Sequence, residues 1–101
     1  MDDKVKDKEN LCDYVIILDK RDNVGTALKD IPVGKYCLND EGSKSVIEVR
    51  ELIRAGFKVS LAELKKDEYI HKYGNVIGMA IKNINPGDKV HIENIKSLIQ
   101  K

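Results

Sequence analysis

The stretch AIKNINPGDKV (residues 80–90) decides the fold, because the same pattern of residue types occurs twice earlier in the chain. The earlier copies are ALKDIPVGKYC (residues 27–37) and SLAELKKDEYI (residues 60–70). Each copy runs from a small residue through an apolar and two polar residues to a second apolar residue, and it reaches Gly or Asp three positions later. Gly and Asp are typical of turn positions that need a positive φ. Each copy therefore predicts an apolar arm, a turn and a second arm.

The apolar residues of the three copies predict the core. In each copy the first arm carries two apolar residues three positions apart, which suits one helical turn or a kinked strand, and we expect both on the core side in either case. Units this short cannot bury their own apolar faces, and the copies start at unequal intervals, so a regular solenoid is excluded. We expect the following residues to be buried together, with the three turns on the surface: Leu28, Ile31, Leu61, Leu64, Ile81 and Ile84.

Short strands separated by frequent turns are predicted for the rest of the chain. Residues 12–18 are rich in β-branched and aromatic side chains and predict a strand covered on both faces. A hairpin-type loop at 39–43 and a strand at 46–49 follow, and residues 50–55 predict a short strand that passes into one helical turn ended by Gly56. The fold class expected is a mostly β protein, a small barrel or clip with short helical turns.

Length and composition indicate one domain of 101 residues with a charged tail in front of it. Residues 1–10 carry seven charged side chains, too many to bury a core, so we expect a disordered tail at 1–10 and the folded domain at 11–101. The 18 basic and 17 acidic residues nearly cancel and aromatic residues make up only 5% of the chain, which argues against nucleic-acid binding.

The apolar runs and the cysteines indicate a cytoplasmic protein with no membrane contact. The longest apolar run, at 14–18, is too short to span a bilayer or to form a signal-peptide core. Cys12 and Cys37 lack the close spacing of zinc or redox pairs, so we expect reduced thiols, with a disulfide between them as the alternative.

Candidate site residues are few, and no complete active site is visible in the sequence. His71 and His91 each follow the last apolar position of a copy, but two His are too few for a zinc site, and solvent-facing strand ends explain them as well. In an extended segment His91 and Glu93 would share one face, either as a polar patch or as an exposed edge, with Asn94 orienting a ligand or closing the strand end.

Four groups of residues between 22 and 94 resemble a known family. In chain order they are Asp22-Asn23-Val24 with Ala27-Leu28; Gly56 and Lys58 with Leu61; Lys72-Tyr73-Gly74 with Ile77-Gly78 and Ala80; and Gly87 with Val90-His91 and Asn94. Together they are similar to the SAF-like N-terminal module of altronate and galactarate dehydratases, and to the separately encoded alpha subunit of sulfolactate sulfo-lyase.

The resemblance implies a β-clip fold and an accessory role. The chain would be the small subunit or N-terminal module of a hydro-lyase or sulfo-lyase, inactive alone, and its end at Lys101 resembles the small-subunit arrangement. A larger catalytic partner would use a divalent metal to remove water or sulfite from a sugar acid or other hydroxy acid. By residue, the resemblance implies catalytic roles for His91 and Glu93 and substrate binding by Lys58, Lys72 and Asn94.

Two positions depart from the family pattern. Relatives carry Gly-His-Lys where this chain has Gly56-Phe57-Lys58, and His-x-His-Asn where it has His91-Ile92-Glu93-Asn94. Phe57 cannot bind a metal or transfer a proton, whereas Glu93 could replace the missing His. The loss at Phe57 favours the alternative function, a stand-alone binding module for a small carbohydrate or a protein partner. The resemblance gives His71 no role. On the residues alone, Lys58 and Lys72 are solvated lysines.

Overall fold

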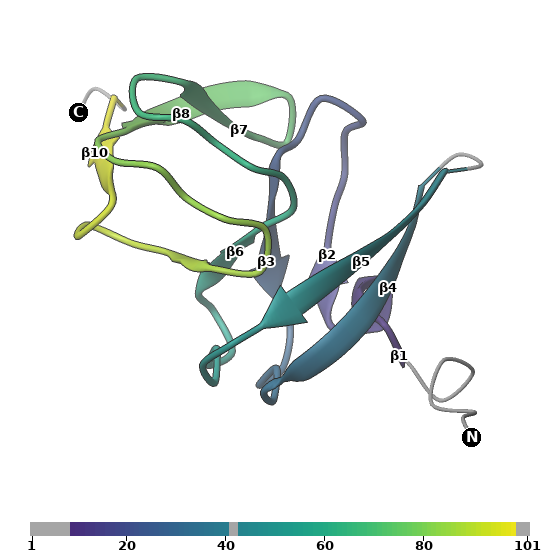
Figure 1. Ribbon diagram of the computed structural model, residues 1–101. Coiled ribbons are helices and arrows are strands. Elements are labelled where there is room, and N and C mark those ends of the chain that lie inside the picture. The colour runs from purple at the N-terminus through teal and green to yellow at the C-terminus, as the bar shows by residue number, and fades with distance from the viewer. Residues whose placement is uncertain (1–8, 41–42, 99–101) are drawn as a thin grey trace.

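The computed structural model describes residues 9–40 and 43–98 of the chain (Figure 1). These residues form ten short strands and one 3-10 helix, joined by turns and loops. The elements are β1 (Glu9–Asn10), η2 (Leu11–Asp13), β2 (Val15–Ile16), β3 (Val24–Ala27), β4 (Gly34–Asp40), β5 (Ser43–Val49), β6 (Lys58–Ser60), β7 (Tyr69–Lys72), β8 (Asn75–Ala80), β9 (Lys89–Val90) and β10 (Ile95–Ser97). They form three sheets with the orders β1-β4-β5, β2-β3-β6-β9 and β10-β8-β7. The predicted fold class, a small and mostly β domain, is confirmed.

The four-stranded sheet lies between the other two sheets, and each side of it has its own apolar cluster (Figure 1). The first cluster consists of Leu11, Tyr14, Val15, Ala27, Ile31, Tyr36, Leu38, Ile47, Val49, Ile53 and Val59. The second cluster consists of Val24, Leu64, Ile70, Ala80, Ile84 and Val90. β3 contributes Ala27 to the first cluster and Val24 to the second, so the two clusters belong to one small domain.

The repeated pattern has a fourth copy that the sequence does not show clearly. Ile31 of the first copy forms an antiparallel bridge with Ile53, just as Leu64 and Ile84 bridge each other. The backbone bonds match as well: in each bridge, both N–H groups donate to the opposite carbonyl, over 2.7 to 3.1 Å. The copy around Ile53 is hidden because Arg50 occupies the position at which the other copies have their first apolar residue. The helical turn predicted for 50–55 is therefore wrong.

The turns after three of the bridging residues share one geometry. Each is closed by a bond from an N–H to a carbonyl three residues earlier, and the positive φ falls on Gly56 (93°), Asp67 (78°) and Gly87 (92°). The N–H of each of these residues donates to the small residue that opens the paired copy, in the pairs Gly56 to Ala27, Asp67 to Ala80 and Gly87 to Ser60. The paired copies thus interlock through equivalent bonds, and the predicted turn role of Asp67 and Gly87 is confirmed.

The predicted core is half correct. Ile31, Leu64 and Ile84 are buried, but Leu28 and Ile81 are 61% and 43% exposed, and Leu61 is only partly buried. The arms are extended instead of helical, and in extended backbone two residues separated by an odd number of positions point to opposite faces. The second apolar residue of each copy therefore enters the core, whereas Leu28 and Ile81 face outward. Ile31 also lies in a different cluster from Leu64 and Ile84.

The N-terminal region differs from the strand predicted at 12–18. The chain forms η2 first, because the Asn10 side chain accepts a hydrogen bond from the Cys12 N–H (2.9 Å) and caps it, and only Val15–Ile16 form a strand. Pairing of β1 with β4 starts the described structure at Glu9, within the predicted tail, while residues 1–8 lie outside the described residues. The antiparallel β4–β5 pair confirms the strand at 46–49 and a hairpin, but Asn39, Asp40 and Ser43 belong to the strands, and residues 41–42 of the predicted loop lie outside the described residues.

Two expectations about the environment of the chain can be compared with the structure. Cys12 and Cys37 are not joined to each other, so the alternative disulfide is not formed in the structure. Within residues 9–40 and 43–98, no helix is long and apolar enough to cross a membrane.

Candidate functional site

Three of the five predicted site residues line one cavity of about 310 Å³. Lys58 is the first residue of β6, Lys72 is the last residue of β7, and His91 directly follows β9. Lys58 and Val90 are register partners in the β6–β9 pair, which places His91 beside Lys58. The full lining consists of Lys58, Lys72, Ile77, Val90, His91, Ile92, Ile95 and Ser97. The sheet topology therefore brings together residues that are up to 39 positions apart in the sequence, as Lys58 and Ser97 are.

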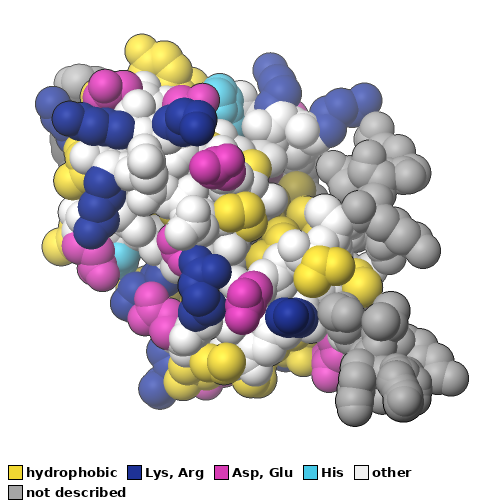
Figure 2. Space-filling view, in the orientation of Figure 1, with side chains coloured by type: hydrophobic (Ala, Val, Ile, Leu, Met, Phe, Trp, Pro, Cys, Tyr) yellow, Lys and Arg dark blue, Asp and Glu magenta, His cyan; other side chains and the backbone are white. Residues whose placement is uncertain are grey.

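Positive charge is concentrated in this cavity. Burial, together with the nearby charge of Lys72, lowers the pKa of Lys58 below its usual range. On the face shown in Figure 2, acidic and basic side chains are interspersed. Several charged side chains of the chain pair, as Arg21 does with Asp19 and Arg50 with Asp88, both at 2.9 Å. Among the described residues, no carboxylate lines the cavity.

His91 lies at the edge of the cavity with its side chain 41% exposed. Its Nδ1 is 3.9 Å from Glu93 Oε1, and its ring meets the Phe57 ring edge-on with the centroids 5.1 Å apart. Glu93 is more exposed and does not line the cavity.

Residues 91–94 form a turn instead of the extended segment on which the sequence argument was based. The N–H of Asn94 donates to the carbonyl of His91 (2.9 Å), which closes the turn. The Asn94 side chain is buried, accepting from the His91 N–H at 2.9 Å and donating to the Lys89 carbonyl at 2.8 Å. These contacts agree with the alternative in which Asn94 closes the strand end. Through its bond to the His91 N–H, the Asn94 side chain also holds the backbone of His91 in place.

The family motif at 22–24 has a structural role that the sequence analysis did not predict. Asp22 Oδ1 accepts a hydrogen bond from the Gly74 N–H, and Asn23 Oδ1 accepts one from the His71 N–H, both at 2.8 Å. Asn23 Nδ2 also donates to the Tyr69 carbonyl. These bonds fasten the loop before β3 to the β7–β8 hairpin.

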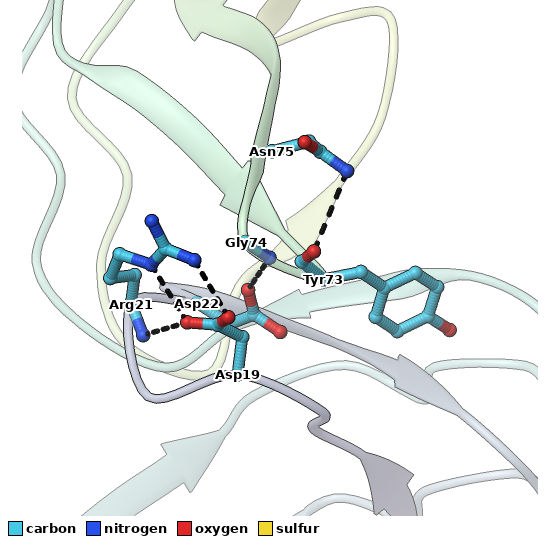
Figure 3. A network of polar contacts seen from close by, with 6 residues as sticks. All are labelled: Asp19, Arg21, Asp22, Tyr73, Gly74 and Asn75. Atoms are coloured by element: carbon cyan, nitrogen blue, oxygen red, sulfur yellow. Dashed lines mark hydrogen bonds and ion pairs between the residues drawn. The ribbon is translucent and has the colours of Figure 1, made fainter.

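The Asp22 contact is packed tightly beside an ion pair (Figure 3). Asp19 and Arg21 form a bidentate pair next to Asp22, and the hydrogen bonds from Arg21 lower the pKa of Asp19. Gly74 has a φ of 79°, and a Cβ on it would lie 2.7 Å from Asp19 Oδ2. Glycine is thus required at this turn, which directly follows Lys72 and its neighbour Tyr73.

The site does not contain a full set of metal ligands. Among residues 9–40 and 43–98, no three His, Cys, Asp or Glu side chains are grouped so that they could hold a metal ion. His91 and Glu93 offer two ligand atoms, one fewer than the three protein ligands typical of catalytic zinc sites. The residues of this chain therefore do not fit a metal by themselves.

A larger cavity of about 490 Å³ lies elsewhere, next to the loop between β2 and β3. Its apolar lining includes Ile17, Leu38 and Leu61. Several polar groups at its edge are bonded within the chain, since Asp19 pairs with Arg21 and both polar atoms of the Asn23 amide contact β7, although the buried Asp22 Oδ2 has no hydrogen-bond partner. Two lysines and a histidine converge in the smaller cavity, which makes it the better candidate site.

Comparison with known proteins agrees with the motifs. Residues 13–98 match the family model of the altronate/galactarate dehydratase SAF domain. Altronate dehydratase of Bacillus subtilis (strain 168) is 39% identical over 82 residues, which cover 81% of this chain but 16% of that enzyme. Altronate dehydratase of Escherichia coli (strain K12) is 32% identical over 76 residues, which cover 75% of this chain and 15% of the enzyme.

A third relative is a separate small subunit. The (2R)-sulfolactate sulfo-lyase subunit alpha of Chromohalobacter salexigens is 33% identical over 58 residues, which cover 57% of this chain and 62% of that subunit. The chain thus spans about one sixth of the dehydratases and under two thirds of the subunit. A match across residues 13–98, from the end of η2 to the residue after β10, shows that the chain belongs to the altronate/galactarate dehydratase SAF-domain family.

Proposed function

We propose that this chain is the accessory module of a carbon–oxygen or carbon–sulfur lyase that acts on a sugar acid or a related hydroxy acid. The observation that carries the proposal is the meeting of Lys58, Lys72 and His91 in one cavity. Two relatives are altronate dehydratases in which the matching region is a small part, and a third is a lyase subunit. In this proposal, the cavity faces the active site of a larger catalytic domain or subunit.

The chemistry of the three side chains suits such a role. Ammonium groups attract the carboxylate of an acidic substrate, and charge-assisted hydrogen bonds of this kind are stronger than neutral ones. An imidazole such as that of His91 is a common general acid or base in catalysis, and Glu93 lies 3.9 Å from it. The divalent metal that the family resemblance implies is assigned to the larger partner, because the described residues of this chain supply two candidate ligands at most.

Reconstitution tests the proposal. Lyase activity is measured with the chain alone, with a large subunit encoded beside it, and with both together. We expect turnover only from the combination. Equal turnover by the large subunit without this chain would contradict an accessory role.

His91 and His71 provide a matched pair for the same assay, because both are histidines but only His91 lines the cavity. We expect His91→Ala to lower turnover by about a hundredfold or more, in the range typical of a lost general acid or base, while assembly is unchanged. His71→Ala should be near normal. A normal rate for an assembled His91→Ala enzyme would remove His91 from the site, and Glu93 with it.

A second candidate function, a stand-alone binding module, is favoured by Phe57. Its ring lies against His91, and Lys89 Nζ lies 5.1 Å from the ring centroid, so an aromatic and a cation occupy the position at which relatives carry a His. Calorimetric titration of sugar acids into the isolated chain separates the two functions. Tight binding without any partner supports the module, whereas weak binding supports the accessory subunit.

A further inference from the structure

Lys58 is half-buried and has no ion-pair partner among the residues that the structure describes. The charge of the neighbouring Lys72 repels the Lys58 ammonium group and helps to lower its pKa. A partly desolvated ammonium beside a second ammonium costs free energy unless an anion compensates it.

Several other cations of the chain contact a carboxylate or an aromatic ring. Arg21, Arg50 and Arg54 pair with carboxylates at 2.9 to 3.6 Å. Lys29, Lys89 and Lys72 lie over the rings of Tyr14, Phe57 and Tyr73. In a chain with 17 acidic residues, a cavity whose described lining has two ammonium groups, a histidine and no carboxylate indicates a place for an external anion.

The remaining walls of the cavity limit what kind of anion fits. Apart from Ser97, the lining beside Lys58, Lys72 and His91 is entirely aliphatic: Ile77, Val90, Ile92 and Ile95. Aliphatic walls give hydroxyl groups no hydrogen-bond partners, and burying a hydroxyl without one is costly. Ile92 at the mouth is 79% exposed, so the entrance is open to solvent or to a partner surface.

We infer that this cavity binds the anionic end of the substrate, a carboxylate or a sulfonate, between Lys58 and Lys72, and that the hydroxyl-bearing carbons extend outward past Ile92. The identity of the acid rests on the proposed function, whereas the anion site rests on the two lysines alone. The bond that is broken would then lie outside this chain, within reach of the larger partner. In this arrangement the module binds the anionic group of the substrate, and the larger partner contacts its hydroxyl groups.

Three small probes test this on the whole chain in solution. Glycerate carries a carboxylate, isethionate carries a sulfonate, and glycerol is the neutral polyol control. Side-chain chemical shifts of Lys58, Lys72 and His91 are followed during titration. We expect saturable, millimolar binding of glycerate, isethionate or both, and which of the two binds identifies the anionic group. Glycerol should cause no saturable shift. A site that responds equally to glycerol, or to none of the three, overturns the inference.

Variants with matched charge changes locate the site. Lys58→Met and Lys72→Met should each weaken anion binding by about tenfold or more, the loss expected for one charge-assisted hydrogen bond. Lys58→Arg keeps the charge and should retain binding. Lys29→Met makes the same charge change at Tyr14, in the first cluster, and should bind as the unmodified chain does. Equal weakening by Lys29→Met would show general charge screening and contradict a specific site.

The outcomes distinguish this inference from the proposed function. If the chain is required for lyase turnover but the lysine variants bind and turn over normally, the anion site is wrong and the accessory role stands. If anions bind between the lysines but turnover does not need this chain, the accessory role is wrong and the anion site stands.

Discussion

The two bridged pairs, Ile31 with Ile53 and Leu64 with Ile84, have the same backbone bonds but different surroundings. The first pair lies in a cluster with the long β4–β5 hairpin and two tyrosines, and the second lies in a smaller, wholly aliphatic cluster. The candidate site belongs to neither pair alone. Lys58 follows the turn after Ile53, His91 follows the turn after Ile84, and the β6–β9 pairing joins them. The repeated pattern thus forms the scaffold, and the candidate site forms where β6 pairs with β9, between the two bridged pairs.

Truncating the bridging residues tests whether the two halves are energetically equivalent. Ile53→Ala and Ile84→Ala should each lower the free energy of unfolding by about 2 to 5 kcal/mol, because both side chains are almost completely buried. Urea denaturation measures this. Leu28→Ala and Ile81→Ala are the controls and should change stability by no more than about 0.5 kcal/mol, since both are exposed. A large cost for the controls would restore the helical interpretation of the repeat.

Two glycines with the same backbone conformation separate turn strain from packing between the halves. Gly56 and Gly87 have φ values of 93° and 92°, but an added Cβ has open space at Gly56 and would lie 2.1 Å from the Glu48 carbonyl oxygen at Gly87. Gly56→Ala should cost about 1 to 2 kcal/mol for the left-handed backbone alone. Gly87→Ala should cost about 1 to 3 kcal/mol more, because β5 must move. Equal thermal stabilities of the two variants would contradict the close approach of this turn to β5.

Alkaline titration distinguishes the two clusters, because the first contains the buried hydroxyl groups of two tyrosines and the second is aliphatic. A hydrogen bond from the Tyr14 hydroxyl to Glu9, aided by burial, raises the pKa of Tyr14 to about 12. The protonated phenol is favoured in the fold, so its stabilisation is present below pH 10 and is lost as the pH rises from about 10 to about 12. Phenolate absorbance should show a late-titrating group that Tyr14→Phe removes. Glu9→Gln should bring that titration to lower pH, and an unchanged titration would exclude the Glu9 contact.

The smallest expected effect is a gain of stability when Lys58, in the β6–β9 pair, is replaced. Because burial and Lys72 lower the pKa of Lys58, the fold disfavours its charged form, and stability should rise with pH between that lowered pKa and 10.5. Lys58→Met removes the penalty and should raise the free energy of unfolding at neutral pH by no more than about 0.5 kcal/mol. Such a gain, together with lost anion binding, is the pattern of a functional residue that costs stability. A clear loss of stability would mean that Lys58 has a structural role.

Much of the local structure could be predicted, because it depends on neighbouring residues. Asp67 and Gly87 adopt the positive φ that their residue types favour, and the strand at 46–49 lies within β5. Burial was harder to predict. Leu28 and Ile81 are as apolar as Ile31 and Ile84, and only the extended backbone of the arms decides which of them faces the core.

The sequence by itself determined the mostly β class, the turns at Asp67 and Gly87 and the family, since these follow from residue types at fixed spacings. Only the tertiary structure decided that Ile53 pairs with Ile31, that Asn94 supports the His91 turn, and that Asp22 and Asn23 fasten the hairpin behind Lys72. The physical reason is that strand pairing joins segments far apart in the chain. No local pattern indicates that Lys58, Lys72 and His91 will share one cavity, and that convergence gives the domain its candidate site.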